Sequence, residues 1–145
     1  LDHEQTRQML HARRLTEITL VRLACRQPRM EDLNRLRALI ESERSCKARG
    51  PAIRLSGEFH LQLAEMAGNA PLAHFLDSLV PLTSLAIAQF DRHLESYCER
   101  HDEIVNAVEC GNAAAAEALL SQHLDFLEEA LLHSGTRSGQ NRVAG

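Results

Sequence analysis

Residues 101–124, HDEIVNAVECGNAAAAEALLSQHL, decide the fold class of this chain of 145 residues. Apolar residues lie three, four and seven positions after the first histidine, which is the spacing of one buried face of an α-helix. Gly111-Asn112 then provides a helix stop, and the alanine-rich stretch behind it begins another helix. Two helices joined by so short a turn are expected to pack as antiparallel neighbours in a bundle.

The rest of the chain repeats this alternation of helical stretches and stop signals. Apolar residues make up 44% of the chain and aromatic residues only 3%, with no Trp, a composition that favours packed helices over sheets. Pro28 and Gly50-Pro51 are expected to stop helices, Gly68-Asn69 to end another, and Pro81 to kink or interrupt the one around it. The predicted helices cover roughly residues 3–27, 29–49, 59–69, 71–94, 97–112 and 113–133.

The predicted fold is therefore all-α, an antiparallel bundle of about six helices. One domain is expected over residues 1–133, and the polar stretch SGTRSGQNRVAG, residues 134–145, is expected to be a disordered tail. The chain opens with LDHEQTRQML and has no initiator methionine, which is consistent with a processed or trimmed piece of a longer protein.

Charge and cysteine usage limit the possible partners and compartment. The formal charge is -4, from 16 basic and 20 acidic residues, so we do not expect this chain to grip DNA with its own surface. The four cysteines show no Cys-x-x-Cys spacing, which is typical of reduced thiols in a cytosolic protein. No signal peptide is visible and no apolar run approaches the roughly 20 residues of a membrane span. We therefore predict a cytoplasmic chain with no membrane partner.

Three of the eight histidines fall on the apolar faces of different predicted helices, namely His60, His101 and His123. A buried imidazole needs a hydrogen-bond partner or a metal ion, because an unpaired polar group in a core costs about 1–3 kcal/mol. From spacing alone, the three are either satisfied core or surface histidines or ligands of a Zn, Ni, Cu or Fe ion. The other five are expected at the surface or at helix ends: His3, His11, His74, His93 and His133.

The stretches FHLQLAEMAGN and HDEIVNAVECGNAAAAEALLSQHL resemble the signature of the FCD family, the C-terminal effector-binding domain of FadR-type GntR transcription regulators. The family pattern is roughly D-x-x-x-H-x-x-x-A-x-x-x-G-N, then H-x-x-I-x-x-A-I, a G-[DN] turn, an alanine-rich start and a final H-L. An R-x-x-x-E pair on the first helix also matches. The resemblance covers nearly the whole chain, through Arg13, Glu17, His60, Ala64, Gly68, Asn69, His101, Ile104, Ala107, Gly111, Asn112 and His123.

The resemblance implies a metal site inside the bundle. In the metal-binding branch of the family an Asp and three His hold a divalent cation beside a pocket for a small carboxylate. The histidines map onto His60, His101 and His123, with Zn or Ni as the expected ion, but the Asp position is Ser56. Ser56 is open to two interpretations. It caps a helix that begins there, or it marks an altered fourth ligand position in a three-histidine site whose open coordination attracts an anionic effector.

Arg13 and Glu17 lie four residues apart and also have two interpretations. They form a surface ion pair of small energetic value, or they belong to the effector site, where the planar guanidinium of Arg13 grips a carboxylate with two hydrogen bonds. The resemblance favours the second interpretation.

The function that the resemblance implies is that of a ligand-sensing, dimerising domain of a bacterial GntR-family regulator, not of an enzyme. We expect a homodimer that binds a small carboxylate and contacts DNA only through an upstream winged-helix domain absent from this chain. Two alternatives remain: a metal-free structural dimerisation module, and a three-histidine metalloenzyme. Against the enzyme, the chain has no H-E-x-x-H sequence and no evident general base.

Overall fold

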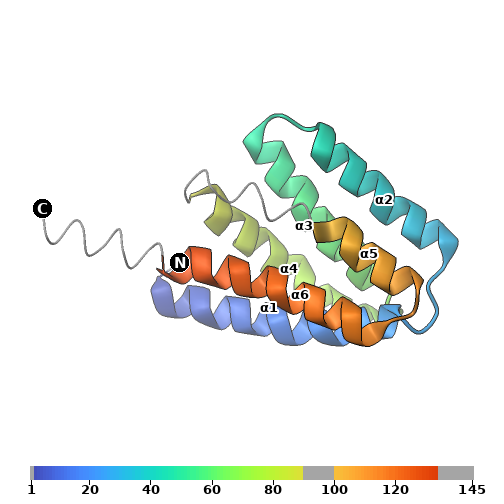
Figure 1. Ribbon diagram of the computed structural model, residues 1–145. Helices are drawn as coiled ribbons and strands as arrows, with labels where there is room; N and C mark the ends of the chain where they lie inside the picture. Colours follow the sequence, from blue (N-terminus) through green and yellow to red (C-terminus); the bar gives the residue numbers. More distant parts are fainter. Residues whose placement is uncertain (1, 90–99, 134–145) are drawn as a thin grey trace, which may run out of the picture.

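The computed structural model describes residues 2–89 and 100–133, which form helices and no strand (Figure 1). The prediction of an all-α fold is confirmed. The described helices are α1 (His3–Ala24), α2 (Met30–Ser45), α3 (Arg49–Glu65), α4 (Ala70–Ala88), α5 (His101–Glu109) and α6 (Ala113–Glu128), with a π-helical turn, η2 (Glu129–His133), continuing α6.

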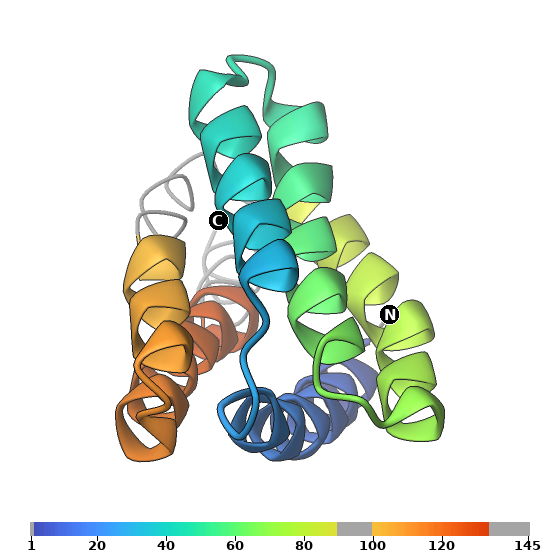
Figure 2. The ribbon, with the colours of Figure 1, turned by 90° about the vertical axis from the view of Figure 1, so that its right-hand side faces the viewer.

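The six α-helices close into a ring in the order α1, α4, α3, α2, α5, α6, because each packs against the next and α6 returns to α1. Figure 2 shows α1 nearly end-on, crossing beneath α2, α3 and α4. Consecutive helices such as α2 and α3 run in opposite directions, as the short connections predict (Figure 1). The interior is mainly aliphatic, and its fully buried side chains include Leu20, Leu33, Leu36, Phe59, Leu76, Ile104, Leu120 and Leu127.

The two Gly-Asn pairs stop one helix and start the next, as predicted. Gly68 and Gly111 have positive φ angles of 80° and 69°, a conformation that glycine adopts without the strain a Cβ would bring. The side chain of Asn69 accepts a hydrogen bond from the Leu72 N–H at 3.1 Å, and Asn112 caps α6 in the same way. These turns fix where α4 and α6 begin.

The expectation that Gly50-Pro51 stops a helix was wrong, and Pro81 does not interrupt the helix around it. Gly50-Pro51 lies in the first turn of α3, which starts at Arg49 rather than at the predicted Phe59. First-turn N–H groups have no acceptor within the helix, so Pro51 forfeits no hydrogen bond there. α4 runs through Pro81 without a break, and Pro81 lies on the exposed side, where water can reach the carbonyl left without its donor.

Several expectations concern residues outside the described ranges. These are the end of the predicted helix 71–94, the start of the predicted helix 97–112, His93, and the tail at 134–145. Within the described residues, α1 ends at Ala24, before the predicted Gln27, and Cys25, Cys46 and Cys110 are free thiols.

α4 is more apolar and more exposed than its neighbours. An 18-residue window of this 19-residue helix has a mean hydropathy of 1.3, and only 28% of that window is buried in the fold. By length and composition it would pass as a membrane-spanning helix, so the expectation that no apolar run approaches that length was wrong. Core helices of other proteins pass the same test. Its outward side chains Phe75, Leu82 and Leu85 are 62%, 38% and 55% exposed, so a large part of its apolar surface has no cover within the described fold.

Candidate metal centre

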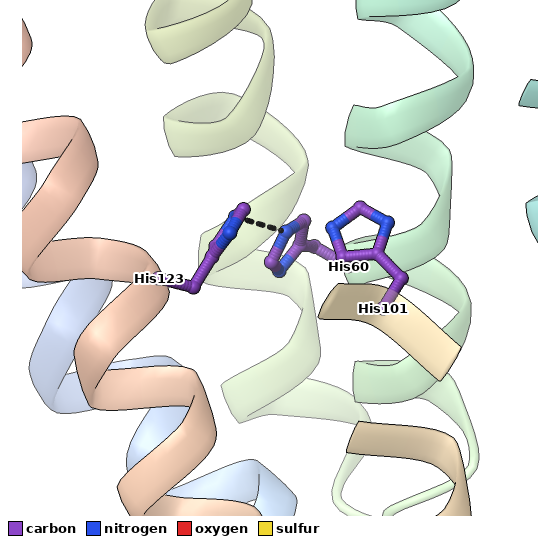
Figure 3. Close-up of side chains that lie close together, drawn as sticks. All are labelled: His60, His101 and His123. Carbon is purple, nitrogen blue, oxygen red and sulfur yellow. Dashed lines mark hydrogen bonds between the residues drawn. The ribbon is translucent and has the colours of Figure 1, made fainter. Parts of the chain in front are cut away.

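Three helices each direct one histidine into the interior of the ring (Figure 3). His60 lies on α3, His101 is the first residue of α5, and His123 lies on α6. Each belongs to the buried face of its helix, and the three side chains are 1%, 0% and 3% exposed. We call these three residues the histidine cluster. The predicted convergence is therefore present in the structure.

The ring nitrogens of the histidine cluster are close enough to share one ion. One nitrogen from each ring lies within 4.8 Å of the other two. The His60 Nε2 to His123 Nε2 distance is 3.2 Å, whereas two nitrogen ligands of a tetrahedral Zn²⁺ are roughly 3.3 Å apart. The same 3.2 Å also suits a hydrogen bond between the two rings, as Figure 3 marks it. Geometry alone thus accommodates an ion or a direct contact.

A buried ion pair contacts the Nδ1 atom of His60. Arg13 Nε donates to Glu17 Oε2 at 2.8 Å, and Glu17 Oε1 is bonded to His60 Nδ1. The side chains of Arg13 and Glu17 are 4% and 3% exposed, so the interpretation of this pair as a surface contact was wrong. α1 buries both residues because they continue the inward stripe of Met9, Leu10, Leu20 and Val21.

Burial, together with the neighbouring charges, determines the protonation of His60. Burial raises the pKa of Glu17, but Arg13 and His60 outweigh burial and lower that pKa to about 2. Burial lowers the pKa of His60 to about 4, against the opposing effect of Glu17. His60 is therefore neutral at pH 7, its Nδ1–H donates to Glu17, and the Nε2 lone pair faces the histidine cluster.

A second buried carboxylate, which the sequence analysis missed, supports His101. Glu43 Oε2 lies 3.2 Å from His101 Nδ1, and Glu43 is only 7% exposed. The Phe59 ring stacks on the His101 ring at a centroid distance of 4.1 Å and an interplanar angle of 8°. The sequence does hold a signal for Glu43, because it extends the buried α2 stripe of Leu33, Leu36 and Ile40.

Ser56 lies in the middle of α3, one turn before His60, and is 3% exposed. The residue before α3 is Ala48, so the interpretation of Ser56 as a helix cap was wrong. Ser56 lines a small cavity of about 10 Å³, roughly the space of one ordered water. The other lining residues are Arg13, Ile53, Gly57, His60, Ser84, Ile87, His123 and Leu127.

The structure thus brings together all six residues predicted for the site. Arg13, Ser56, His60 and His123 share the cavity, Glu17 links Arg13 to His60, and the His101 ring lies 5.2 Å from the His60 ring. Four of the five remaining histidines are exposed as predicted: His3, His11, His74 and His133.

The described part of the chain is a helical bundle with a polar centre enclosed by all of its helices. The model of the FCD domain matches residues 8–126, and the chain therefore belongs to the FCD domain family. The chain is also similar to the HTH-type transcriptional regulator LutR of Bacillus subtilis (strain 168), with 29% identity over 137 residues. That match covers 88% of this chain but only 63% of LutR. The predicted family is confirmed.

Proposed function

We propose that this chain is the effector-sensing and dimerisation domain of a bacterial GntR-family transcription regulator of the cytoplasm. In this proposal it binds a small organic acid beside a divalent metal ion held by His60, His101 and His123. The observation that carries the proposal is the convergence of three buried imidazoles from three helices. DNA would be contacted by an upstream winged-helix domain. The similarity to an HTH-type regulator of which the chain covers only 63% supports that arrangement.

The donor set fits a late transition metal such as Zn or Ni. Neutral imidazole is a common ligand of these ions, and His101 Nε2 is buried without a hydrogen-bond partner among the described residues. When bound, the ion would supply a positive Lewis-acidic centre that can hold a carboxylate. Three neutral ligands leave both charges of the ion uncompensated within the ligand set, and this favours an anionic effector.

The cavity beside the histidine cluster supports a mechanism by population shift. Arg13 retains guanidinium donors beyond the Nε that binds Glu17, so it can recognise an acid without giving up that bond. A cavity of about 10 Å³ holds a water but no organic acid. The effector must therefore bind a form of the bundle in which α3 and α4 lie further from α1 and α6, so that the cavity between them is larger. Movement of α4 would then carry the signal to its exposed face.

Ser56→Asp should strengthen metal binding in the absence of any acid. The new carboxylate would lie one turn before His60 and add a charged ligand, so we expect Zn²⁺ affinity to rise about tenfold or more. The added negative charge should at the same time weaken the effect of acetate on Zn²⁺ binding. Chelator competition with and without acetate measures both. Ser42→Asp places the same charge on the exposed side of α2 and serves as control. Equal Zn²⁺ affinity in Ser56→Asp and wild type would contradict the three-histidine site.

A second candidate function is a metal-free helical dimerisation module. The observation in its favour is the 3.2 Å contact between His60 Nε2 and His123 Nε2, which lets two of the histidines satisfy each other without an ion. A protein that takes up neither Zn²⁺ nor Ni²⁺ would support this function. An enzymatic role has less support, because Glu17 and Glu43 are each bonded to a histidine Nδ1 and neither carboxylate is placed as a general base.

We propose that a second copy of the chain packs against the exposed side of α4. This α4 outer face consists of Phe75, Ser78, Pro81, Leu82 and Leu85. From Ser78 to Gln89 the helix carries no ionisable side chain. A twofold axis would therefore bring apolar groups together without opposing like charges, as an isologous interface requires.

Leu85→Glu should convert the dimer into a monomer. Each substitution acts twice in a twofold interface and would bury two carboxylates against apolar surface, so we expect dimer affinity to fall roughly 100-fold or more. Sedimentation velocity across a concentration series measures the change. Met30→Glu, which places the same charge on an exposed apolar residue of α2, should leave the dimer intact. A wild-type monomer would contradict the proposal, and binding of wild type but not Leu85→Glu to phosphatidylcholine vesicles would make α4 a membrane-contacting helix instead.

A further inference from the structure

Glu43 occupies a position where packing alone favours an apolar side chain. It follows Leu33, Leu36 and Ile40 on the inward stripe of α2, and those three residues are 2%, 0% and 5% exposed. A carboxylate buried among such groups is costly unless it is paired. Glu43 Oε2 has the His101 Nδ1 as partner, but Glu43 Oε1 has none among the described residues. The burial of Glu43 therefore costs free energy, and core packing does not explain why a carboxylate lies there.

The two buried carboxylates of the site differ in their charge balance. Glu17 is neutralised by Arg13 at 2.8 Å. Glu43 has no lysine or arginine within ion-pair distance in the part of the chain that the structure describes, and His101 is its one recorded ion-pair contact. When ionised, Glu43 therefore places a negative charge in the interior with no lysine or arginine beside it. A dication bound by the histidine cluster would balance it from the far side of the His101 ring.

Glu43 also decides which nitrogen of His101 is available. A carboxylate at 3.2 Å from Nδ1 favours the tautomer with a proton on Nδ1, which leaves a lone pair on Nε2. The stacked Phe59 ring restrains the plane of the imidazole. His101 Nε2 is buried and has no hydrogen-bond partner among the described residues. Oriented in this way, that nitrogen is available as a metal ligand.

We propose that Glu43 is a positioning residue for a divalent cation: through His101 it fixes the metal-binding tautomer and supplies the negative charge that the neutral ligand set lacks. This inference rests on the metal site of the proposed function. It extends that site to α2, which contributes no ligand. Carboxylates behind ligating histidines typically contribute 10- to 100-fold to metal affinity.

Glu43→Gln tests the proposal, because it keeps the size of the side chain and removes its charge. We expect Zn²⁺ affinity, measured by chelator competition, to fall about 10- to 100-fold. The melting temperature of the metal-free protein should stay the same or rise, since an unbalanced buried charge is gone. Glu41→Gln makes the same charge change on the exposed side of α2 and should leave Zn²⁺ affinity unaltered.

Nitrogen-15 spectra of the histidine side chains in the metal-free protein give a readout that a merely structural role would not move. We expect the Nδ1–H tautomer for His101 in the wild type, and a mixture of tautomers in Glu43→Gln, whose amide can either donate or accept. An Nε2–H tautomer in the wild type would overturn the proposal. So would unchanged Zn²⁺ affinity in Glu43→Gln, while a wild-type protein that binds no Zn²⁺ would overturn the metal site itself.

Discussion

Alanine at any one of His60, His101 or His123 is expected to abolish metal binding at the proposed site. In the proposed site each imidazole would supply one of three protein ligands, and a site reduced to two neutral ligands should bind Zn²⁺ roughly 100-fold or more weakly. Wild-type protein loaded with Zn²⁺ or Ni²⁺ and freed of excess metal should retain about one equivalent by mass spectrometry. Each of the three variants should retain close to none.

The control for this experiment is His11→Ala, which removes an exposed histidine of α1 and should retain the full equivalent. Circular dichroism distinguishes metal loss from unfolding, since each variant also removes a buried ring. Loss of metal in only one or two of the variants would mean that the histidine cluster is not the ligand set. A wild-type protein without metal after both incubations would favour the metal-free dimerisation module.

Local sequence signals predicted the helices and two of the turns, and failed where the outcome depends on position within a helix. Gly68-Asn69 and Gly111-Asn112 were predicted correctly because a positive φ angle and a capping side chain are local requirements. Gly50-Pro51 was misinterpreted because proline ends a helix from its interior but suits its first turn. Sequence alone does not tell which of these positions a proline takes.

The site was predictable to the extent that it follows helical periodicity. His60, His101 and His123 each occupy an apolar face, and the i,i+4 spacing of Arg13 and Glu17 predicts a pair. The burial of this pair depends on the packing of α1 against α3, α4 and α6. No local sequence pattern predicts that packing. Glu43 was missed for the same reason, because its partner His101 lies on α5 and meets α2 only when the ring of helices closes.

Ser56 shows both a local sequence signal and the effect of packing between helices. Its serine side chain and the neighbouring glycine are typical of a helix start, but α3 begins about two turns earlier at Arg49. Gly57 is required for a different reason, since a Cβ there would lie 3.0 Å from Val80 Cγ1 and 3.1 Å from Ser84 Oγ of α4. The small residues at this point let α3 and α4 approach closely, and the small size of the cavity follows from that approach.

Arg13→Met is expected to have the largest effect on stability, about 3–5 kcal/mol in the free energy of unfolding. The substitution removes the cation that keeps the pKa of Glu17 at about 2 against burial, and it leaves that carboxylate enclosed beside His60. Urea unfolding followed by circular dichroism measures the loss, with the slope of the transition checked for two-state behaviour.

Arg14→Met is the matched control, because Arg14 also forms ion pairs from α1, with Asp125 at 2.5 Å and Glu128 at 3.3 Å. The Arg14 side chain is 25% exposed and its partners are 68% and 43% exposed, so water screens these pairs and we expect a loss of no more than about 1 kcal/mol. Equal losses at the two positions would mean that the Arg13–Glu17 pair does not hold an enclosed charge. A much larger loss at Arg13 would show that the polar centre depends on this pair for its stability, and that an acid recruiting Arg13 must leave its bond to Glu17 in place.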